Sequence, residues 1–422
     1  MTDAPPTGRG GVAAATAILA GFAAFESGTA IAKDDFGYLM WGLQTRGDLL
    51  AWVPGPEWLT YRRPLNALLW WLSAQTGFDG ELVRWSQVGL WVAFGLTLLV
   101  VARSSARGMV TLGLLLLTNQ VFVDLLQWRS WLTTTGSLAF LVLAAVAMER
   151  RAPALAIALL GALALGFKEV GAVAVAVIAL SRPGYRAVGG ILLAGVCASA
   201  GSSPQKLGLS FIADNIRFHV ETIALFVPAV PVLIAARFPK LPPWSLVAPV
   251  VLLVLPAPVR ATVVVVAAGL FFLGEARWLP AAAVATTLPL LGAAHARQYL
   301  LEGWAVLLLA LTAGKKLAVS PIAWLTMLAL AAPSAIDFET ARSHLREQFA
   351  RQRAFILDFH RPPAAHLYHP EIAWSWDLDA LYWVRGGATL EGRPPAGTEP
   401  VQVGPLSGVW ADARPAQGSG SR

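Results

Sequence analysis

Residues 154–180 read ALAIALLGALALGFKEVGAVAVAVIAL and contain only two charged side chains, Lys168 and Glu169. A helix that crosses a bilayer needs about 20 mostly apolar residues, and its backbone groups must be hydrogen-bonded within the helix. This stretch therefore predicts two apolar membrane helices that meet at a short charged break. Comparable charge-free runs occupy residues 11–25 and 263–273.

The whole chain has the composition of a membrane protein. Of its 422 residues, 56% are hydrophobic and 14% are charged, whereas about 25% are charged in soluble domains. A soluble fold of this length could not cover so much apolar area, which excludes a nucleic-acid-binding domain and an ordinary soluble enzyme. The single cysteine, Cys197, excludes a disulfide scaffold.

The hydropathy pattern predicts an all-α polytopic membrane protein with about thirteen apolar segments. They run roughly over 11–31, 85–102, 109–126, 131–148, 152–166, 170–181, 186–200, 222–236, 244–256, 259–274, 278–293, 300–313 and 318–335. Residues 1–335 would form the membrane domain. Residues 336–422 would form a short extracytoplasmic extension with a disordered tip.

Basic turns predict how the chain is oriented. If the N-terminus is cytoplasmic, alternate connections carry Arg103/Arg107, Arg150/Arg151, Arg182/Arg186, Arg237/Lys240, Arg277 and Lys315/Lys316. This is the positive-inside pattern of a multi-pass plasma (inner) membrane protein. The long loops at about 32–84 and 201–221 and the C-terminal extension then lie outside. The sequence Ala30-Ile31-Ala32 leaves open a cleaved signal peptide as an alternative start.

The first outer loop, 32–84, is expected to contain helices of its own. Asp35–Arg46 has the pattern of an amphipathic helix, and Pro64–Ser73 is a second apolar segment. The second segment is too short to span a bilayer, so it is expected to lie at the interface or to re-enter the membrane.

An acidic pair, Asp34-Asp35, directly follows the first apolar segment. Adjacent carboxylates at a membrane surface can deprotonate a hydroxyl group or bind a divalent cation such as Mg²⁺ or Mn²⁺. They can equally cap the following helix, and the pair alone does not separate these roles.

Several cationic residues fall on the same predicted outer side. Arg62 and Arg63, within Tyr61-Arg62-Arg63-Pro64-Leu65, run against the positive-inside trend and suit phosphate binding, although they could also extend toward lipid headgroups. Lys168 is expected to face an anion other than Glu169, because neighbours on a helix point in different directions. A short polar turn at the surface is the alternative.

A further cation opens a late apolar segment. Arg297 lies in His295-Ala296-Arg297-Gln298-Tyr299-Leu300, where Arg297 and Tyr299 could serve a phosphate site or contact headgroups. Less specific polar residues in other outer loops include His219. The histidines at 360, 366 and 369 lack the spacing of a metal site and are assigned to the surface.

Taken together, the acidic pair and the cations fit the use of a lipid-linked phosphate donor. A carboxylate would activate an acceptor hydroxyl group, and the cations would stabilise the departing phosphate. The lipid tail of the donor would enter between helices, which requires an enzyme embedded in the membrane.

The order of these motifs resembles that of the GT-C superfamily, multi-spanning glycosyltransferases that use polyprenyl- or dolichyl-phosphate sugars. The resemblance covers roughly residues 10–335. It implies a helical bundle with outer loop helices over the site, Asp34 as the catalytic base or metal ligand, and Asp35 as its partner. Donor phosphate binding would fall to Arg62, Arg63, Lys168 and Arg297, with Tyr61, Glu169, His219 and Tyr299 in support. Gln298 departs from the family pattern, in which arginine often directly precedes the tyrosine.

The sequence thus predicts sugar transfer from a polyprenyl-phosphate donor to a lipid, glycan or protein acceptor on the outer face. No cofactor is certain, and a divalent cation remains an option. Nucleic acid is not an expected partner. A transporter or lipid flippase is the alternative, although transporters often place charges midway along helices and show repeated halves. A non-catalytic membrane protein that retains the fold is the third hypothesis.

Overall fold

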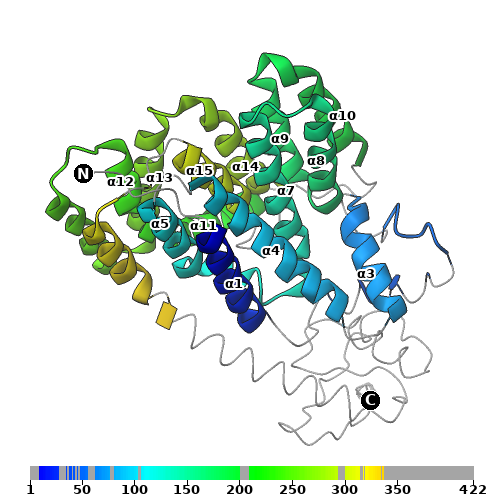
Figure 1. Cartoon of the computed structure of the whole chain (residues 1–422), viewed down its shortest axis with the longest axis horizontal. Helices are drawn as coiled ribbons and strands as arrows, with labels where there is room; N and C mark the ends of the chain where they lie inside the picture. The colour runs from blue at the N-terminus through cyan, green and yellow to red at the C-terminus, as the bar shows by residue number, and fades with distance from the viewer. Residues whose placement is uncertain are drawn as a thin grey trace, which may run out of the picture.

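The computed structural model describes residues 9–27, 35, 38–39, 41–42, 45, 48–55, 62–76, 80–102, 106–199, 209–292, 300–313, 317, 319–333 and 335–336. Within these residues every regular element is a helix, which confirms the all-α prediction (Figure 1). The C-terminal extension lies outside the described residues.

The helices follow the predicted apolar segments closely along the chain. They are α1 (Arg9–Glu26), α3 (Pro64–Thr76), α4 (Glu81–Ala102), α5 (Ala106–Thr118), α6 (Gln120–Asp124), α7 (Leu132–Glu149), α8 (Ala154–Phe167), α9 (Glu169–Leu180), α10 (Arg186–Ser199), α11 (Leu209–Ala224), α12 (Val230–Arg237), α13 (Ala257–Phe272), α14 (Leu279–Gly292) and α15 (Leu301–Ala313). Short 3₁₀ turns join several of them, and a helix over Pro321–Pro333 follows α15. The short helix predicted at 64–73 is confirmed as α3.

Two continuous helices in the described part of the chain are long and apolar enough to cross a membrane. They cover Glu81–Val101 and Arg129–Glu149, at 21 residues each. The number rises to 4 if each of two bent helix pairs counts as one span. The other apolar helices have 10–17 residues, shorter than the ~20 residues that a straight span needs. The count of about thirteen spans therefore stays a prediction.

Four segments differ from the expected pattern. The apolar segment predicted at 109–126 is divided into α5 and α6 at Asn119, and the one predicted at 222–236 is divided between α11 and α12. The apolar segment predicted at 244–256 is a 3₁₀-helix over Pro243–Val254, with Pro249 inside it. A proline in a helix interior removes a backbone donor and disfavours the α-helical turn. The predicted outer loop 201–221 is helical from Leu209 onward as α11. Its side chains alternate between buried and exposed positions at helical spacing, with Asn215 buried and Arg217 exposed.

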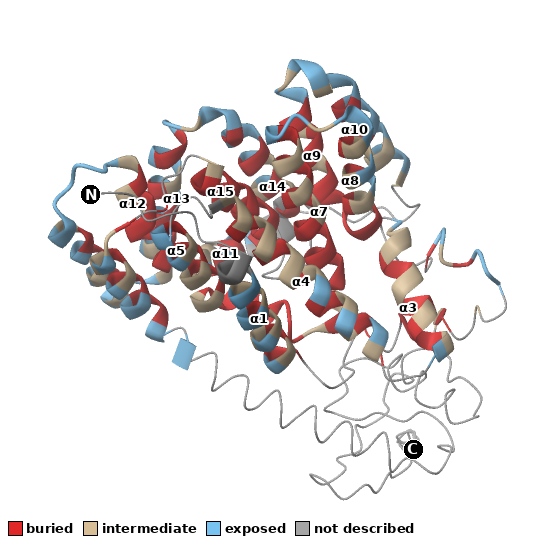
Figure 2. Cartoon of the chain, viewed as in Figure 1, coloured by how far each residue is buried: buried red, intermediate tan, exposed pale blue. Residues whose placement is uncertain are grey.

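The core of the bundle is built around α7 and α15. The helix α7 packs against α4, α8, α9 and α15, and every residue of α15 from Leu301 to Thr312 is buried. Figure 2 shows this central position, with buried residues throughout α15 and exposed residues on α1 and α10. Any polar side chain on α15 must therefore find its partner inside the protein.

The two ends of the bundle are marked by different side-chain contacts of charged residues. Glu149, the last residue of α7, lies 3.4 Å from Arg277 and also pairs with Arg182. Three of the basic turns used to predict orientation therefore lie at one end. At the other end, Arg84 Nε donates to Ser27 Oγ at 2.9 Å, so the end of α1 and the start of α4 lie together.

Close helix packing leads to the first prediction. A Cβ atom on Gly136 of α7 would collide with the ring of Phe167, which stacks on Phe140 with ring centroids 5.9 Å apart. Gly136→Ala is therefore expected to lower the free energy of unfolding by about 1–3 kcal/mol. Thermal unfolding in detergent tests this. The matched variant Gly113→Ala, whose Cβ meets no atom within 4 Å, should be neutral or slightly stabilising. Equal melting temperatures for the two variants would contradict the packing described.

Candidate functional site

A buried ion pair lies where α8 gives way to α9. Lys168 has an extended backbone, with φ −162° and ψ 136°, between the helical residues Phe167 and Glu169. Its Nζ lies 2.8 Å from Glu302 Oε1 on α15 and 3.1 Å from Thr134 Oγ1 on α7. The side chains of Lys168 and Glu302 are 1% and 0% exposed. Three helices are therefore joined through one ammonium group.

A second ion pair lies directly beside the first. Arg63, just before α3, donates from Nε to Glu169 Oε2 at 3.2 Å. Its Nη2 lies 3.1 Å from Oε1 and 3.0 Å from Oε2 of the same carboxylate. Arg63 and Glu169, which belong to separate sequence motifs, thus contact each other directly. The planar guanidinium suits this two-point binding better than a lysine would.

Together the four side chains form a cluster that we call the ionic cluster: Arg63, Glu169, Lys168 and Glu302. Two are cationic and two are anionic, so their formal charges cancel. Buried charges are costly unless they are paired and hydrogen-bonded, and ionisable groups among apolar helices are often functional. The structure satisfies this requirement with two neighbouring pairs.

Asp35, one of the two predicted catalytic carboxylates, is held close to the start of α7. It is 1% exposed, and its Oδ1 accepts a hydrogen bond from Ser130 N at 2.9 Å. The described residues of its segment fit the predicted amphipathic helix, because Asp35, Tyr38, Leu39 and Gly42 are all buried. That spacing of three and four residues makes one helix face.

The position of Asp35 relative to the ionic cluster follows from α7. Ser130, which contacts Asp35, and Thr134, which contacts Lys168, are four residues apart on the 3₁₀ turn Arg129–Trp131 and the first turn of α7. Four residues rise by about 6 Å along a helix. The predicted base region and a predicted phosphate-site cation are therefore anchored to neighbouring turns of the same element.

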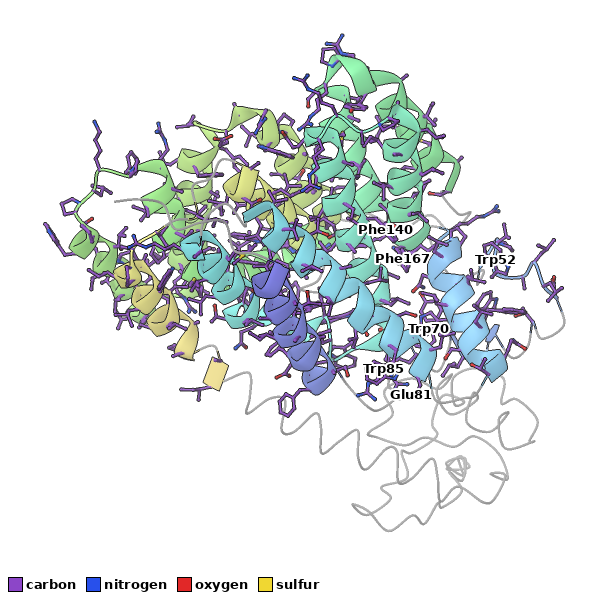
Figure 3. The ribbon with its side chains drawn as sticks, in the orientation of Figure 1. Trp52, Trp70, Glu81, Trp85, Phe140 and Phe167 are labelled. Atoms are coloured by element: carbon purple, nitrogen blue, oxygen red, sulfur yellow. The ribbon has the colours of Figure 1, made fainter. Side chains whose placement is uncertain are left out.

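Further charges surround the start of α7. Arg129 is 1% exposed, and its Nη2 lies 3.0 Å from Glu81 Oε1 at the start of α4. A Cβ atom on Gly80, which has φ +63°, would collide with this guanidinium. In Figure 3, Glu81 and Trp85 lie at the beginning of α4, below Trp70, and Phe140 and Phe167 lie together near the end of α8.

Other predicted site residues lie in different surroundings. Arg62 is exposed, and its backbone N–H donates to Ser199 O at the end of α10 at 2.9 Å. His219 is buried on α11, where its ring lies 6.0 Å from that of Phe218. Asp34, Tyr61, Arg297 and Tyr299 fall outside the described residues.

Sequence reasoning missed Glu302 and Thr134. The expectation that Lys168 faces an anion other than Glu169 is confirmed, but that anion belongs to the protein itself. The available signal was a single acidic residue in the apolar segment 300–313. Such a residue at the start of a fully buried helix requires a cationic partner.

A metal site receives no support from the described side chains. Among them, no group of three or more histidine, cysteine, aspartate or glutamate residues could hold a metal ion. Asp34, the other carboxylate of the predicted pair, is not among them. The divalent cation stays a prediction.

No family model, curated protein or solved structure matches the chain. Function is therefore inferred from the side chains of the site and from the physical character of the helices that hold them.

Proposed function

We propose that the chain is a membrane glycosyltransferase of the GT-C type, with about thirteen membrane spans. It would transfer a sugar from a polyprenyl-phosphate donor to a lipid, glycan or protein acceptor on the outer face of the plasma (inner) membrane. The observation that carries the proposal is the arrangement around the start of α7. There, a buried carboxylate, Asp35, and a buried cation, Lys168, are bound to Ser130 and Thr134, two residues that lie about one helical turn apart at the start of α7.

The proposed reaction needs one proton acceptor and one site for a leaving phosphate. A carboxylate of the Asp34-Asp35 pair, with Asp34 as base and Asp35 as partner, takes the proton of the acceptor hydroxyl group. The acceptor oxygen then bonds to the anomeric carbon of the sugar, and the bond from that carbon to the phosphate oxygen breaks. The polyprenyl phosphate leaves with the bonding electron pair, and its negative charge is stabilised by cations.

The cations differ in how readily they could meet a phosphate group. Arg63 and Lys168 already bind Glu169 and Glu302, so a phosphate would compete with carboxylates for them. Arg62 is exposed and lies next to this cluster along the chain. In our proposal Arg62 makes the first contact with the donor phosphate, Arg297 joins it, and the ionic cluster supplies a fixed electrostatic environment behind them.

The distribution of charge favours an enzyme over a transporter. Lys168 lies at a break between helices, Arg63 directly precedes α3, and Glu302 is in the first turn of α15. Each group is at a helix end near the start of α7. A transport pathway would instead place such groups midway along helices that line a cavity.

The test uses the purified full chain in detergent with radiolabelled sugar donors. Decaprenyl phosphate carrying mannose, glucose or arabinose is compared with the corresponding nucleotide sugars, with membrane lipids as acceptor. We expect transfer only from the lipid-linked donors. Transfer from nucleotide sugars alone, or movement of labelled lipid across vesicles without any transfer, would contradict the proposal.

Arg62 provides a second prediction from the same assay. Arg62→Gln is expected to raise KM for the lipid-linked donor by about tenfold, the equivalent of one charge-assisted hydrogen bond. The melting temperature should not change, because the side chain is exposed. Arg217→Gln, which removes another exposed cation, is the control and should leave KM unaltered. An unchanged KM for Arg62→Gln would remove Arg62 from the donor site.

A further inference from the structure

One face of α3 carries buried polar groups that have no hydrogen-bond partner in the part of the chain that the structure describes. Both amide atoms of Asn66, Nε1 of Trp70 and Oγ of Ser73 are in this state. All three residues are 0% exposed. Buried polar groups are almost always paired, and each exception needs an explanation. Trp71 Nε1 is a fourth such group, so four of the 13 residues of this helix are exceptions. Three of these residues share one face: Asn66, Trp70 and Ser73.

The three residues lie along one stripe of the helix, which we call the α3 stripe. Positions 66, 70 and 73 are separated by four and three residues, so their side chains follow each other on the same face. The stripe spans about 10 Å along the helix axis, which matches one or two sugar rings. It begins three residues after Arg63, which belongs to the ionic cluster.

The stripe is also linked to the segment that carries the predicted base. Tyr38 stacks on Trp70, with ring centroids 5.2 Å apart and an interplanar angle of 10°. Gln75 Nε2 donates to Gly42 O at 2.9 Å, which fixes the same segment to α3. Trp70 packs with Val83 of α4 and Phe167 of α8 in one apolar cluster, on the side of α3 that faces α4 (Figure 3).

The chemistry of the stripe suits a sugar. The asparagine amide offers two donors and an acceptor, the indole offers one donor, and the serine hydroxyl offers both. Neighbouring hydroxyl groups of a sugar present the complementary set, and the C–H face of its ring packs on an aromatic side chain. The partners that these groups lack are those that a sugar would bring.

We propose that the α3 stripe recognises the hydroxyl groups of the sugar on the donor, and that the sugar takes the place of the Tyr38 ring against Trp70. This inference rests on the proposed function, because the α3 stripe would be the part of the proposed glycosyltransferase site that binds the sugar. The phosphate would then lie toward Arg62 and Arg63, and the sugar would extend along α3 beneath the segment that carries Asp35.

The test compares stability and sugar selectivity in the same variants. Asn66→Leu and Ser73→Ala remove polar atoms without partners, so both should raise the melting temperature of the ligand-free protein by a few degrees. Dissociation constants are measured for decaprenyl phosphate alone and for decaprenyl phosphate carrying mannose, glucose or arabinose. In the wild type, at least one sugar should strengthen binding. Asn66→Leu should reduce the increase in affinity that this sugar provides about tenfold, and Ser73→Ala should reduce the increase less.

Thr76→Ala, on the exposed end of α3, is the control and should preserve both readouts. If Asn66→Leu and Ser73→Ala are stabilised but keep the full gain from the sugar, the stripe is only a packing defect and the inference is wrong. It is equally wrong if no sugar in the panel strengthens binding to the wild type. Failure of the proposed function is a separate result. If the protein binds these lipids with sugar selectivity but never transfers the sugar, the role of the α3 stripe in sugar recognition is supported and the proposed glycosyltransferase activity is wrong.

Discussion

Glu302→Leu is expected to lower the free energy of unfolding by about 3–5 kcal/mol, the cost of breaking a buried ion pair by removing one partner. The variant removes the carboxylate that lies 2.8 Å from Lys168 Nζ, although the side chain of Lys168 is 1% exposed. The hydroxyl of Thr134, 3.1 Å from the same nitrogen, carries no compensating charge. Lys168→Met should cost a similar amount, because it leaves the carboxylate of Glu302 buried without its cation. Chemical unfolding in mild detergent measures both changes.

The double variant Lys168→Met/Glu302→Leu separates pairing from packing. Apolar side chains of similar volume often replace a buried ion pair with little loss of stability, so the double variant should regain most of what either single variant loses. Glu221→Leu is the control, since its pair with Arg217 is long, 3.7 Å, and both side chains are exposed. Such pairs contribute about 0–1 kcal/mol. A double variant as unstable as the sum of the singles would contradict the pairing of Lys168 with Glu302.

The second large effect is expected at the acidic pair. Asp35→Asn should lower the rate of sugar transfer by about 10²–10⁴-fold, because it removes the charged partner of the base Asp34, and a positioned acid–base group usually contributes an effect of that size. The fold should survive, because the asparagine side-chain oxygen can still accept the hydrogen bond from Ser130 N. Asp34→Asn should reduce transfer at least as strongly, because we assign the proton to Asp34.

Measurement of transfer rate and melting temperature on the same preparations distinguishes a catalytic role of Asp35 from a role as a helix cap. If Asp35 is only a helix cap, Asp35→Asn will keep nearly full activity, because asparagine caps as well as aspartate. Asp35→Ala provides the comparison, since it removes the acceptor as well as the charge and should lose both stability and activity.

Much of the fold could be predicted from the sequence, because apolar runs and their breaks are local features. The break at Lys168 and Glu169 was visible as two charges inside a long apolar stretch, and it separates α8 from α9 as expected. The short helix α3 followed from a segment too short to span a bilayer. The membrane spans were harder to count, because several helices are shorter than the bilayer thickness and two pairs are bent.

The partners within the site could not be predicted, because they join residues far apart in sequence. Lys168 and Glu302 meet across α9 and α15, and Arg63 reaches Glu169 from the first loop. A charge inside an apolar run predicts that a partner exists, but helix packing decides which residue it is. The α3 stripe was hidden for a similar reason, since Asn66, Trp70 and Ser73 become informative only when their lack of partners is known.

The most direct test of the central claim is sugar transfer by the purified chain, measured side by side for the wild type and the double variant Asp34→Asn/Asp35→Asn. The donor is radiolabelled decaprenyl-phosphate sugar, and release of decaprenyl phosphate is measured together with the glycosylated product. We expect the wild type to form both products in equal amounts and the double variant, at matched folding, to form neither above background. Undiminished transfer by the double variant, or no transfer by the wild type from any lipid-linked donor, would contradict the account.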